Sequence, residues 1–216
     1  LSGRVDASSK FAKGNKYGFF PSGAVAWRVS DEQFMSGVEF ITNLKIRASY
    51  GLIGNQSIPP YQSLALVGPF GQGVFNNPSG IPEIISGQEP LSYPNQYLRW
   101  ESTEQANLGV DLSVLDNRIT FTAEVYHKNT FDLLLSTPIP YTTGFANTLL
   151  NIGNVQNRGI DLELSSINTT GEFSWNTSVN FSVNRNKVLN LAREDDILLG
   201  FGGNILRENE PIGSFY

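Results

Sequence analysis

Residues 173–184 read FSWNTSVNFSVN, and this stretch decides the fold. Its odd-numbered positions carry Phe, Trp, Val and a single Thr, whereas its even-numbered positions carry only Ser and Asn. Successive side chains of a β-strand point to opposite faces, so an alternation with period two predicts a strand. One face of this strand suits hydrocarbon and the other suits water.

The same period recurs along the chain, and the helical period of 3.6 is nearly absent. The charged residues inside these segments all fall on the polar parity: Arg28, Lys45, Arg47, Asp111, Glu124, Asp161 and Glu163. We therefore expect an all-β fold of antiparallel, up-and-down strands. The further alternating segments are 25–29, 44–50, 108–114, 119–125 and 160–164.

Composition excludes several classes of function. The 216 residues include no Cys and a single His, His127, which removes disulfide scaffolds, thiolate zinc sites and cysteine catalysis. A net charge of -5 argues against a nucleic-acid partner, since such proteins carry a basic field. We expect no catalytic, cofactor-binding or metal-binding set, and the chain is not predicted to be an enzyme.

Two architectures use strands with one apolar face. A soluble β-sandwich packs the apolar faces together, and a membrane β-barrel turns them toward lipid around a polar lumen. The sandwich predicts that Leu112, Val114, Phe121 and Trp175 are buried against a second sheet. The barrel predicts that the same side chains point outward. Alternation alone leaves both open.

The connections favour the barrel. Short links at Asp116–Asn117, at residues 167–172 and at 31–42, the last expected as a short helical turn, alternate strictly with long ones. Short turns at one end and long loops at the other are typical of outer-membrane barrels. The expected strands, about 10–14 residues, exceed the about 5–6 usual in globular sheets and suit a bilayer crossing. The long connections are predicted at about 53–98, 136–148 and 187–210.

Aromatic residues gather near the expected strand ends. Such rings form girdles at the two membrane interfaces of a barrel, although aromatics also favour strands for their packing. They are Phe19, Phe20, Trp27, Tyr50, Trp100, Tyr126, Phe131 and Phe173.

Several longer motifs resemble those of SusC/RagA-type TonB-dependent outer-membrane transporters. The likeness covers nearly the whole chain in the family's order and spacing, with Asn209 where the family usually has Gly. The matching stretches are Arg4–Phe11 with Phe20–Ser22 and Ala26–Arg28, Leu44–Gly51 with Gly54–Gln56, Leu98–Asp111, Asn117–Arg118, Asn151–Asp161, Asn184–Val188 and Glu210–Tyr216.

The resemblance implies that residues 1–216 are an internal part of a transmembrane barrel of about 22 strands in the outer membrane of a Bacteroidetes-type bacterium. The plug domain, the TonB box and the last strands are expected to be absent from this stretch. Short turns would be periplasmic and the long connections extracellular. The parent protein would import glycans or peptides with energy from TonB, and a SusD-like surface lipoprotein would cap it. Outer-membrane lipid would surround the barrel.

Aromatic residues of the long connections are the candidates for substrate contact, because rings stack on sugar faces or grip peptide side chains. The alternative is that they pack the loops together or against the capping partner. Trp100, Glu101 and Asn151 are expected to be structural. The rival function is a soluble β-sandwich that binds carbohydrate or acts as an adhesin. The candidate contacts are Tyr61, Phe70, Phe75, Tyr93, Tyr141 and Phe145.

Overall fold

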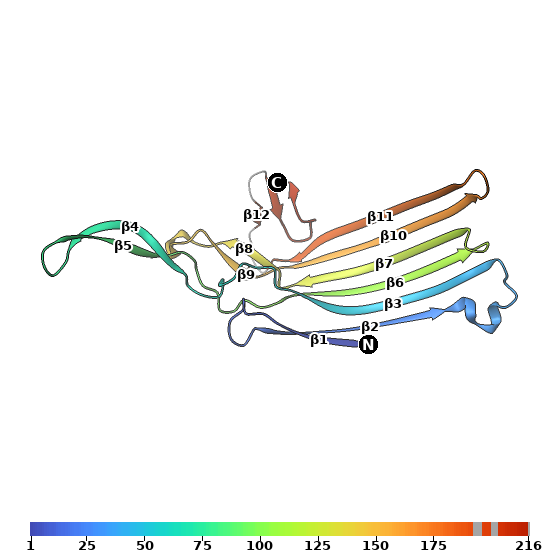
Figure 1. Cartoon of the computed structure of the whole chain (residues 1–216), viewed down its shortest axis with the longest axis horizontal. Helices are drawn as coiled ribbons and strands as arrows, with labels where there is room; N and C mark the ends of the chain where they lie inside the picture. The colour runs from blue at the N-terminus through green and yellow to red at the C-terminus, as the bar shows by residue number, and fades with distance from the viewer. Residues whose placement is uncertain (192–195, 200–202, 216) are drawn as a thin grey trace.

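The computed structural model describes residues 1–191, 196–199 and 203–215. Within them, one seven-stranded antiparallel sheet dominates, with neighbouring strands in chain order (Figure 1). The prediction of an all-β, up-and-down fold is confirmed. The strands of this main sheet are β1 (Ser2–Ala7), β2 (Tyr17–Arg28), β3 (Ile41–Asn55), β6 (Glu101–Val114), β7 (Ile119–Phe131), β10 (Asn154–Thr169) and β11 (Trp175–Asn190).

The connections divide between two ends of this sheet. At one end, here the turn end, lie residues 29–40, 115–118 and 170–174. At the opposite loop end lie residues 8–16, 56–100, 132–153 and the described residues after β11, as Figure 1 shows. The strands are also long: β10 and β11 each have 16 residues. That exceeds the about 9–11 residues a tilted strand needs to cross a bilayer.

The turn end differs in detail from expectation. A short helical turn is expected in residues 31–42, and the link holds the 3-10 turn η2 (Gln33–Met35) there, preceded by a second one, η1 (Val29–Asp31). The β6–β7 turn spans 115–118, because Leu115 takes a positive φ of 55° together with Asp116 and Asn117. Asp and Asn readily adopt a positive φ, so they are recognisable as turn residues in a sequence. Leu rarely adopts it, so the sequence does not indicate that the turn begins at Leu115.

The long connections contain strands of their own. β3 continues to Asn55 and β6 begins at Glu101, so the first connection is shifted by a few residues from 53–98. Of the predicted connection 187–210, residues 192–195 and 200–202 lie outside the described residues. The added elements are β4 (Val67–Asn76), β5 (Pro82–Pro90), β8 (Leu134–Pro138), η3 (Tyr141–Thr143), β9 (Asn147–Asn151), β12 (Ile197–Leu199), β13 (Asn204–Leu206) and β14 (Ser214–Phe215).

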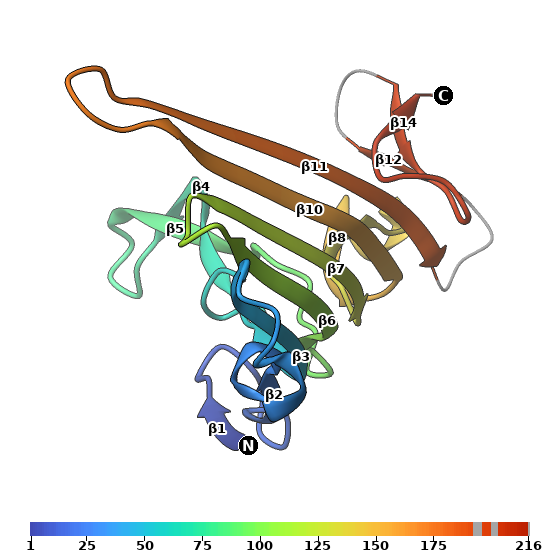
Figure 2. The same cartoon turned by 90° about the vertical axis from the view of Figure 1, so that its right-hand side faces the viewer.

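The apolar parity forms a continuous face, called the outer face, and no second sheet formed by the described residues covers it. Figure 2 shows the main sheet as a single curved layer. Trp175, Val179 and Phe181 are 55%, 54% and 57% exposed, and Leu112 is half-buried. A sandwich requires these side chains to be buried against a facing sheet, so the sandwich alternative is wrong for this chain.

The register of the strands places apolar residues directly opposite one another, so the apolar face continues from strand to strand. One row of directly opposed residues runs through Trp27, Ile46, Val110, Ala123, Leu162 and Phe181. A slip of one residue would exchange the two faces of a strand. Hydrocarbon on one face and charge on the other therefore specify the pairing.

The two clusters of buried hydrophobic residues lie at the loop end and not on the outer face. Phe11, Phe20, Ile58, Leu98 and Trp100 form one cluster, in which the Phe20 and Trp100 ring centroids lie 5.4 Å apart, edge to face. These two aromatics were expected near the strand ends as girdle candidates, and they are core residues instead. A second cluster joins the main sheet to the C-terminal hairpin: Val155, Val188, Leu191, Ile197 and Leu206.

Among the described residues, no helix is long and apolar enough to cross a membrane.

Leu162 provides the sharpest test of the outer face. Leu162→Arg should lower the free energy of unfolding of the membrane-inserted protein by about 2–4 kcal/mol, because a cation would meet hydrocarbon. Thr122→Arg is the matched control. Thr122 lies on the polar face of the sheet, where its cross-strand partners are Asp111 and Glu163. Its cost should stay below about 1 kcal/mol. Denaturant titration followed by tryptophan fluorescence measures both, and equal costs would contradict the assignment of the faces.

Candidate functional site

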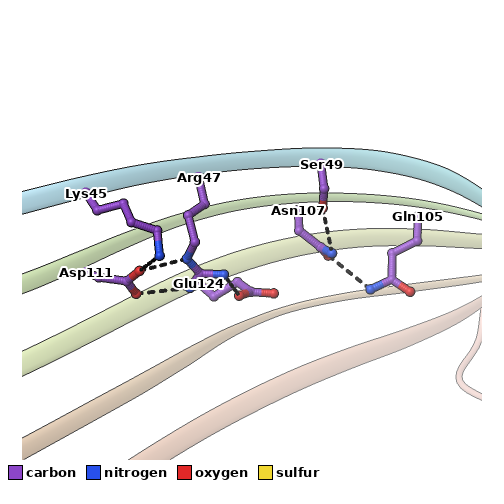
Figure 3. Close-up of polar contacts among 7 residues, drawn as sticks. All are labelled: Lys45, Arg47, Ser49, Gln105, Asn107, Asp111 and Glu124. Atoms are coloured by element: carbon purple, nitrogen blue, oxygen red, sulfur yellow. Dashed lines mark hydrogen bonds and ion pairs between the residues drawn. The ribbon is translucent and has the colours of Figure 1, made fainter. Parts of the chain in front are cut away.

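The polar parity forms the inner face of the sheet, and four charged side chains meet there. Arg47 Nε donates to Asp111 Oδ2 at 2.9 Å, and its Nη2 donates to Oδ1 at 3.1 Å. Arg47 Nη1 donates to Glu124 Oε2 at 3.3 Å. Lys45 Nζ lies 3.4 Å from Asp111 Oδ2. Figure 3 shows the four side chains converging from β3, β6 and β7.

Strand register and a glycine explain this geometry. Lys45 lies directly opposite Asp111, whereas Arg47 lies opposite Gly109, which lies opposite Glu124. A Cβ at Gly109 would stand 2.9 Å from Arg47 Nη2. The missing side chain therefore leaves room for the guanidinium to cross β6 and reach the carboxylate on β7.

The charges of this network cancel, and its side chains remain accessible to water. Two cations face two carboxylates, and their side chains are between 24% and 35% exposed. Ion pairs with that access to water contribute about 1 kcal/mol or less each. The network therefore orders the inner face without creating a strong field of one sign.

A neutral polar row continues from the network toward the loop end. Asn107 Nδ2 donates to Ser49 Oγ at 3.3 Å, and Gln105 Nε2 donates to Asn107 Oδ1 at 3.0 Å (Figure 3). These side chains line an open concavity of about 700 Å³ with Arg4 and Phe20. Amide and hydroxyl groups of this kind hydrogen-bond water, hydroxyl-rich solutes and peptide backbones.

A separate framework holds the loop end together. Asn151 Oδ1 accepts from the Arg99 backbone N–H at 2.9 Å, and its Nδ2 donates to the carbonyls of Arg99 and Asp132. Arg99 also forms a two-pronged pair with Asp132, at 2.9 and 2.7 Å. This hydrogen-bonded carboxylate raises the pKa of Arg99 above its ordinary value.

Two other motif residues belong to the same framework. Glu101 accepts from Asn55 Nδ2 at 3.0 Å and from the Leu134 backbone N–H at 3.1 Å. Trp100 Nε1 donates to the Lys16 carbonyl at 3.1 Å. These hydrogen bonds support the prediction that Trp100, Glu101 and Asn151 are structural, because each of the three side chains holds a connection of the loop end in place.

The six aromatic candidates all lie at the loop end, outside the main sheet, and two of them meet. Tyr93 and Phe145 pack edge to face with centroids 5.9 Å apart. Tyr141 is 84% exposed on η3, and Phe70 and Phe75 are exposed on the β4 strand. The structure thus joins one pair and leaves the others, including Tyr61 with its positive φ of 66°, apart.

The sequence places the four residues of the inner-face network on the polar parity, but it does not show that they meet. Lys45, Arg47, Asp111 and Glu124 share the polar parity on three strands that follow one another in the main sheet. Their contact depends on register, which a single sequence does not specify. Tyr126, expected near a strand end as a girdle residue, belongs to this face too and donates to Asn184 Oδ1 at 3.0 Å.

Comparison with known proteins gives a consistent result. Residues 1–208 match the family model described as TonB dependent receptor-like, beta-barrel. The chain is 38% identical over its full length to a TonB-dependent receptor of Formosa agariphila, and 34% identical over 89% of its length to SusC of Bacteroides thetaiotaomicron. It spans only 22% and 19% of those relatives.

Solved structures agree with this comparison. The structure of the RagAB peptide transporter superposes on 99% of the chain with a TM-score of 0.85 at 28% identity, and the chain covers 23% of it.

A double-mutant cycle tests the inner-face network. Arg47→Met and Asp111→Asn should show a coupling energy of about 1 kcal/mol in unfolding of the membrane-inserted protein, reduced by high salt. Asp6, paired with Arg4 on β1, supplies the control carboxylate. The Arg47→Met and Asp6→Asn pair should be additive within about 0.5 kcal/mol. Additivity of Arg47 with Asp111 would show that the contact does not form.

Asn151→Ala tests the framework at the loop end. The substitution removes the two hydrogen bonds to the backbone N–H and carbonyl of Arg99 and the one to the carbonyl of Asp132. The β8–β9 hairpin should therefore be destabilised by about 1–3 kcal/mol. Faster amide hydrogen exchange in that hairpin measures the effect. Asn147→Ala in the same strand is the control, because Asn147 is exposed. Equal exchange in the two variants would mean that Asn151 does not tie the hairpin down.

Proposed function

Because the chain belongs to the TonB dependent receptor-like β-barrel family, we propose that it forms wall and outer loops of a transporter that imports nutrient oligomers, glycans or peptides, across the outer membrane. The observation that carries this proposal is the uncovered outer face combined with a polar inner face. A sheet of this kind separates hydrocarbon from a wet lumen. The barrel it belongs to has about 22 strands, and such barrels are plugged.

The two ends give the wall a direction. Short turns are typically periplasmic and long connections extracellular in outer-membrane barrels. The turn end then faces the periplasm, and residues 56–100 and 132–153 face the outside. The plug and the TonB box belong to parts of the receptor other than residues 1–216. TonB acts through those parts and moves the plug with energy from the inner-membrane proton gradient.

The inner face suits the passage of polar oligomers. The Arg47 network pairs two cations with two carboxylates, so it adds no strong field of one sign that would trap a charged group. The row from Ser49 to Gln105 offers exchangeable hydrogen bonds along the concavity. Substrate is first held at the loop end, where the Tyr93–Phe145 pair and the exposed aromatics supply flat apolar surfaces. These features suit sugar rings and peptide side chains alike.

The β4–β5 hairpin is the proposed contact for a SusD-like surface lipoprotein. It extends well beyond the main sheet in Figure 1. Phe70, Val74 and Ile84 are each more than 60% exposed on it. An isolated two-stranded hairpin is marginally stable in water, so apolar side chains along it favour a protein cover. The likeness of this chain to the solved RagAB peptide transporter supports the proposal of such a partner.

Transport measurements test the proposal and decide the substrate class. Cells that lack the full-length receptor should lose uptake of labelled oligosaccharides or of labelled peptides, and cells that lack TonB should lose the same class. Uptake of both pools that is unchanged in the receptor-deficient cells would contradict the import role. Uptake that persists without TonB would contradict the energy source.

The aromatic pair provides a finer test. Tyr93→Leu with Phe145→Leu in the full-length receptor should raise the substrate concentration for half-maximal uptake by about tenfold, since each ring contributes about 0.5–1.5 kcal/mol of contact. Phe34→Leu is the matched control, because Phe34 is an exposed aromatic at the turn end. If the pair variant takes up substrate like the control, these rings serve loop packing alone.

A further inference from the structure

A row of basic side chains crosses the outer face near its loop end. His127 on β7 lies directly opposite Arg158 on β10, and Arg158 lies directly opposite Arg185 on β11. Lys187 follows two residues later on β11, with the same parity and opposite Gln156. All four basic side chains are exposed. We call them the cation row.

The cation row has no carboxylate of its own in the part of the chain that the structure describes. No ion pair joins Arg158, Arg185 or Lys187 to any described residue, and His127 contacts only the amide of Gln156, at 3.5 Å. Glu104 shares this face but lies opposite Asn129, two strands from Arg158. Like charges directly opposite one another destabilise a sheet. The row therefore favours the binding of an external anion, in contrast to the Arg47 network, whose cations are paired with carboxylates.

The level of the row is defined by its neighbours. On β11, Val179, Phe181 and Val183 form the apolar band, and Arg185 stands ten positions beyond Trp175 at the turn end. A strand of about 9–11 residues crosses the hydrocarbon of a bilayer, so Arg185 lies where the band ends. Tyr50 occupies the same cross-strand level, through Ala106 and His127, and tyrosine is enriched at membrane interfaces.

We propose that the cation row binds the phosphate groups of a lipid in the outer leaflet. The inference rests on the proposed orientation, in which the loop end faces outward. The Cβ atoms of directly opposed residues on neighbouring strands lie about 5 Å apart, so two opposed arginines can reach one phosphate group. Each guanidinium can donate two parallel hydrogen bonds to phosphate oxygens. Ile160 and Val183, directly below on the same face, offer apolar surface to the acyl chains. Free phosphate would leave that surface unused, and this favours a lipid as the source.

Removal of the two arginines tests the proposal. The full-length receptor is placed in phosphatidylcholine nanodiscs that contain bisphosphorylated lipid A, and bound lipid is counted by native mass spectrometry. Arg158→Gln with Arg185→Gln should weaken retention of lipid A by at least about tenfold. Lipid A stripped of both phosphates should bind weakly and equally to wild type and variant.

Lys128→Gln is the matched control. Lys128 is the neighbour of His127 on β7 and has the opposite parity, so this variant removes one positive charge from the inner face and none from the cation row. Its lipid A retention should equal that of wild type. Retention that is unchanged in the double variant, or reduced equally by Lys128→Gln, would overturn the proposal. Competition by inorganic phosphate at the same concentration as lipid A would show a free-anion site instead.

Thermal unfolding separates binding from misfolding. In uncharged detergent without phosphate, the double variant should melt at the same temperature as wild type or above it, because repulsion between the arginines is removed. Added lipid A should raise the melting temperature of wild type only, and an equal rise in the variant would contradict the site. Uptake that depends on TonB without a lipid effect would refute this inference alone. A lipid effect without TonB-dependent uptake would refute the import role alone.

Discussion

Strand parity is the constraint on which the rest of this structure depends. Each strand of the main sheet gives one face to apolar side chains and the other to charged or polar ones, and register aligns these faces over seven strands. Between neighbouring strands of the sheet, backbone donors and acceptors pair with one another, as any lipid-exposed sheet requires. Ile46 and Arg47, adjacent in sequence, thus belong to different environments. A one-residue slip of β3 would bury the guanidinium in hydrocarbon and remove it from Asp111.

The same constraint separates stability from function along the strands. Near the middle, the inner face holds the balanced Arg47 network, and the outer face meets lipid. At the loop end, buried aromatics and the hydrogen bonds of Asn151 fix the connections to the strands. The exposed aromatics beyond this framework are the residues that we propose as contacts for substrate or for a partner. The cation row marks the level at which the outer face stops being apolar.

Much of the fold could be predicted, because period two and the spacing of turn residues are local properties. Residues 173–184 alone define a two-faced strand. The candidate site was harder to predict from the sequence. In the sequence, Phe20 and Trp100 lie near expected strand ends, where girdle aromatics are predicted. In the structure, the β1–β2 connection folds over both side chains and buries them. The Arg47 network required the register of three strands and the absence of a side chain at Gly109. The pairing of Tyr93 with Phe145 joins two connections 52 residues apart, which no local pattern reveals.

Accessibility of neighbouring positions on β11 tests the central claim most directly. Phe181 lies on the outer face, and Asn180 lies on the inner face opposite Glu163. The chain has no cysteine, so a spin label at Phe181→Cys or Asn180→Cys in the bilayer-embedded receptor reports one position within it. We expect the label at 181 to be relaxed by lipid-soluble oxygen and the label at 180 by a water-soluble nickel chelate. A label at 181 that is shielded from both would place the apolar face against protein and contradict the transporter wall.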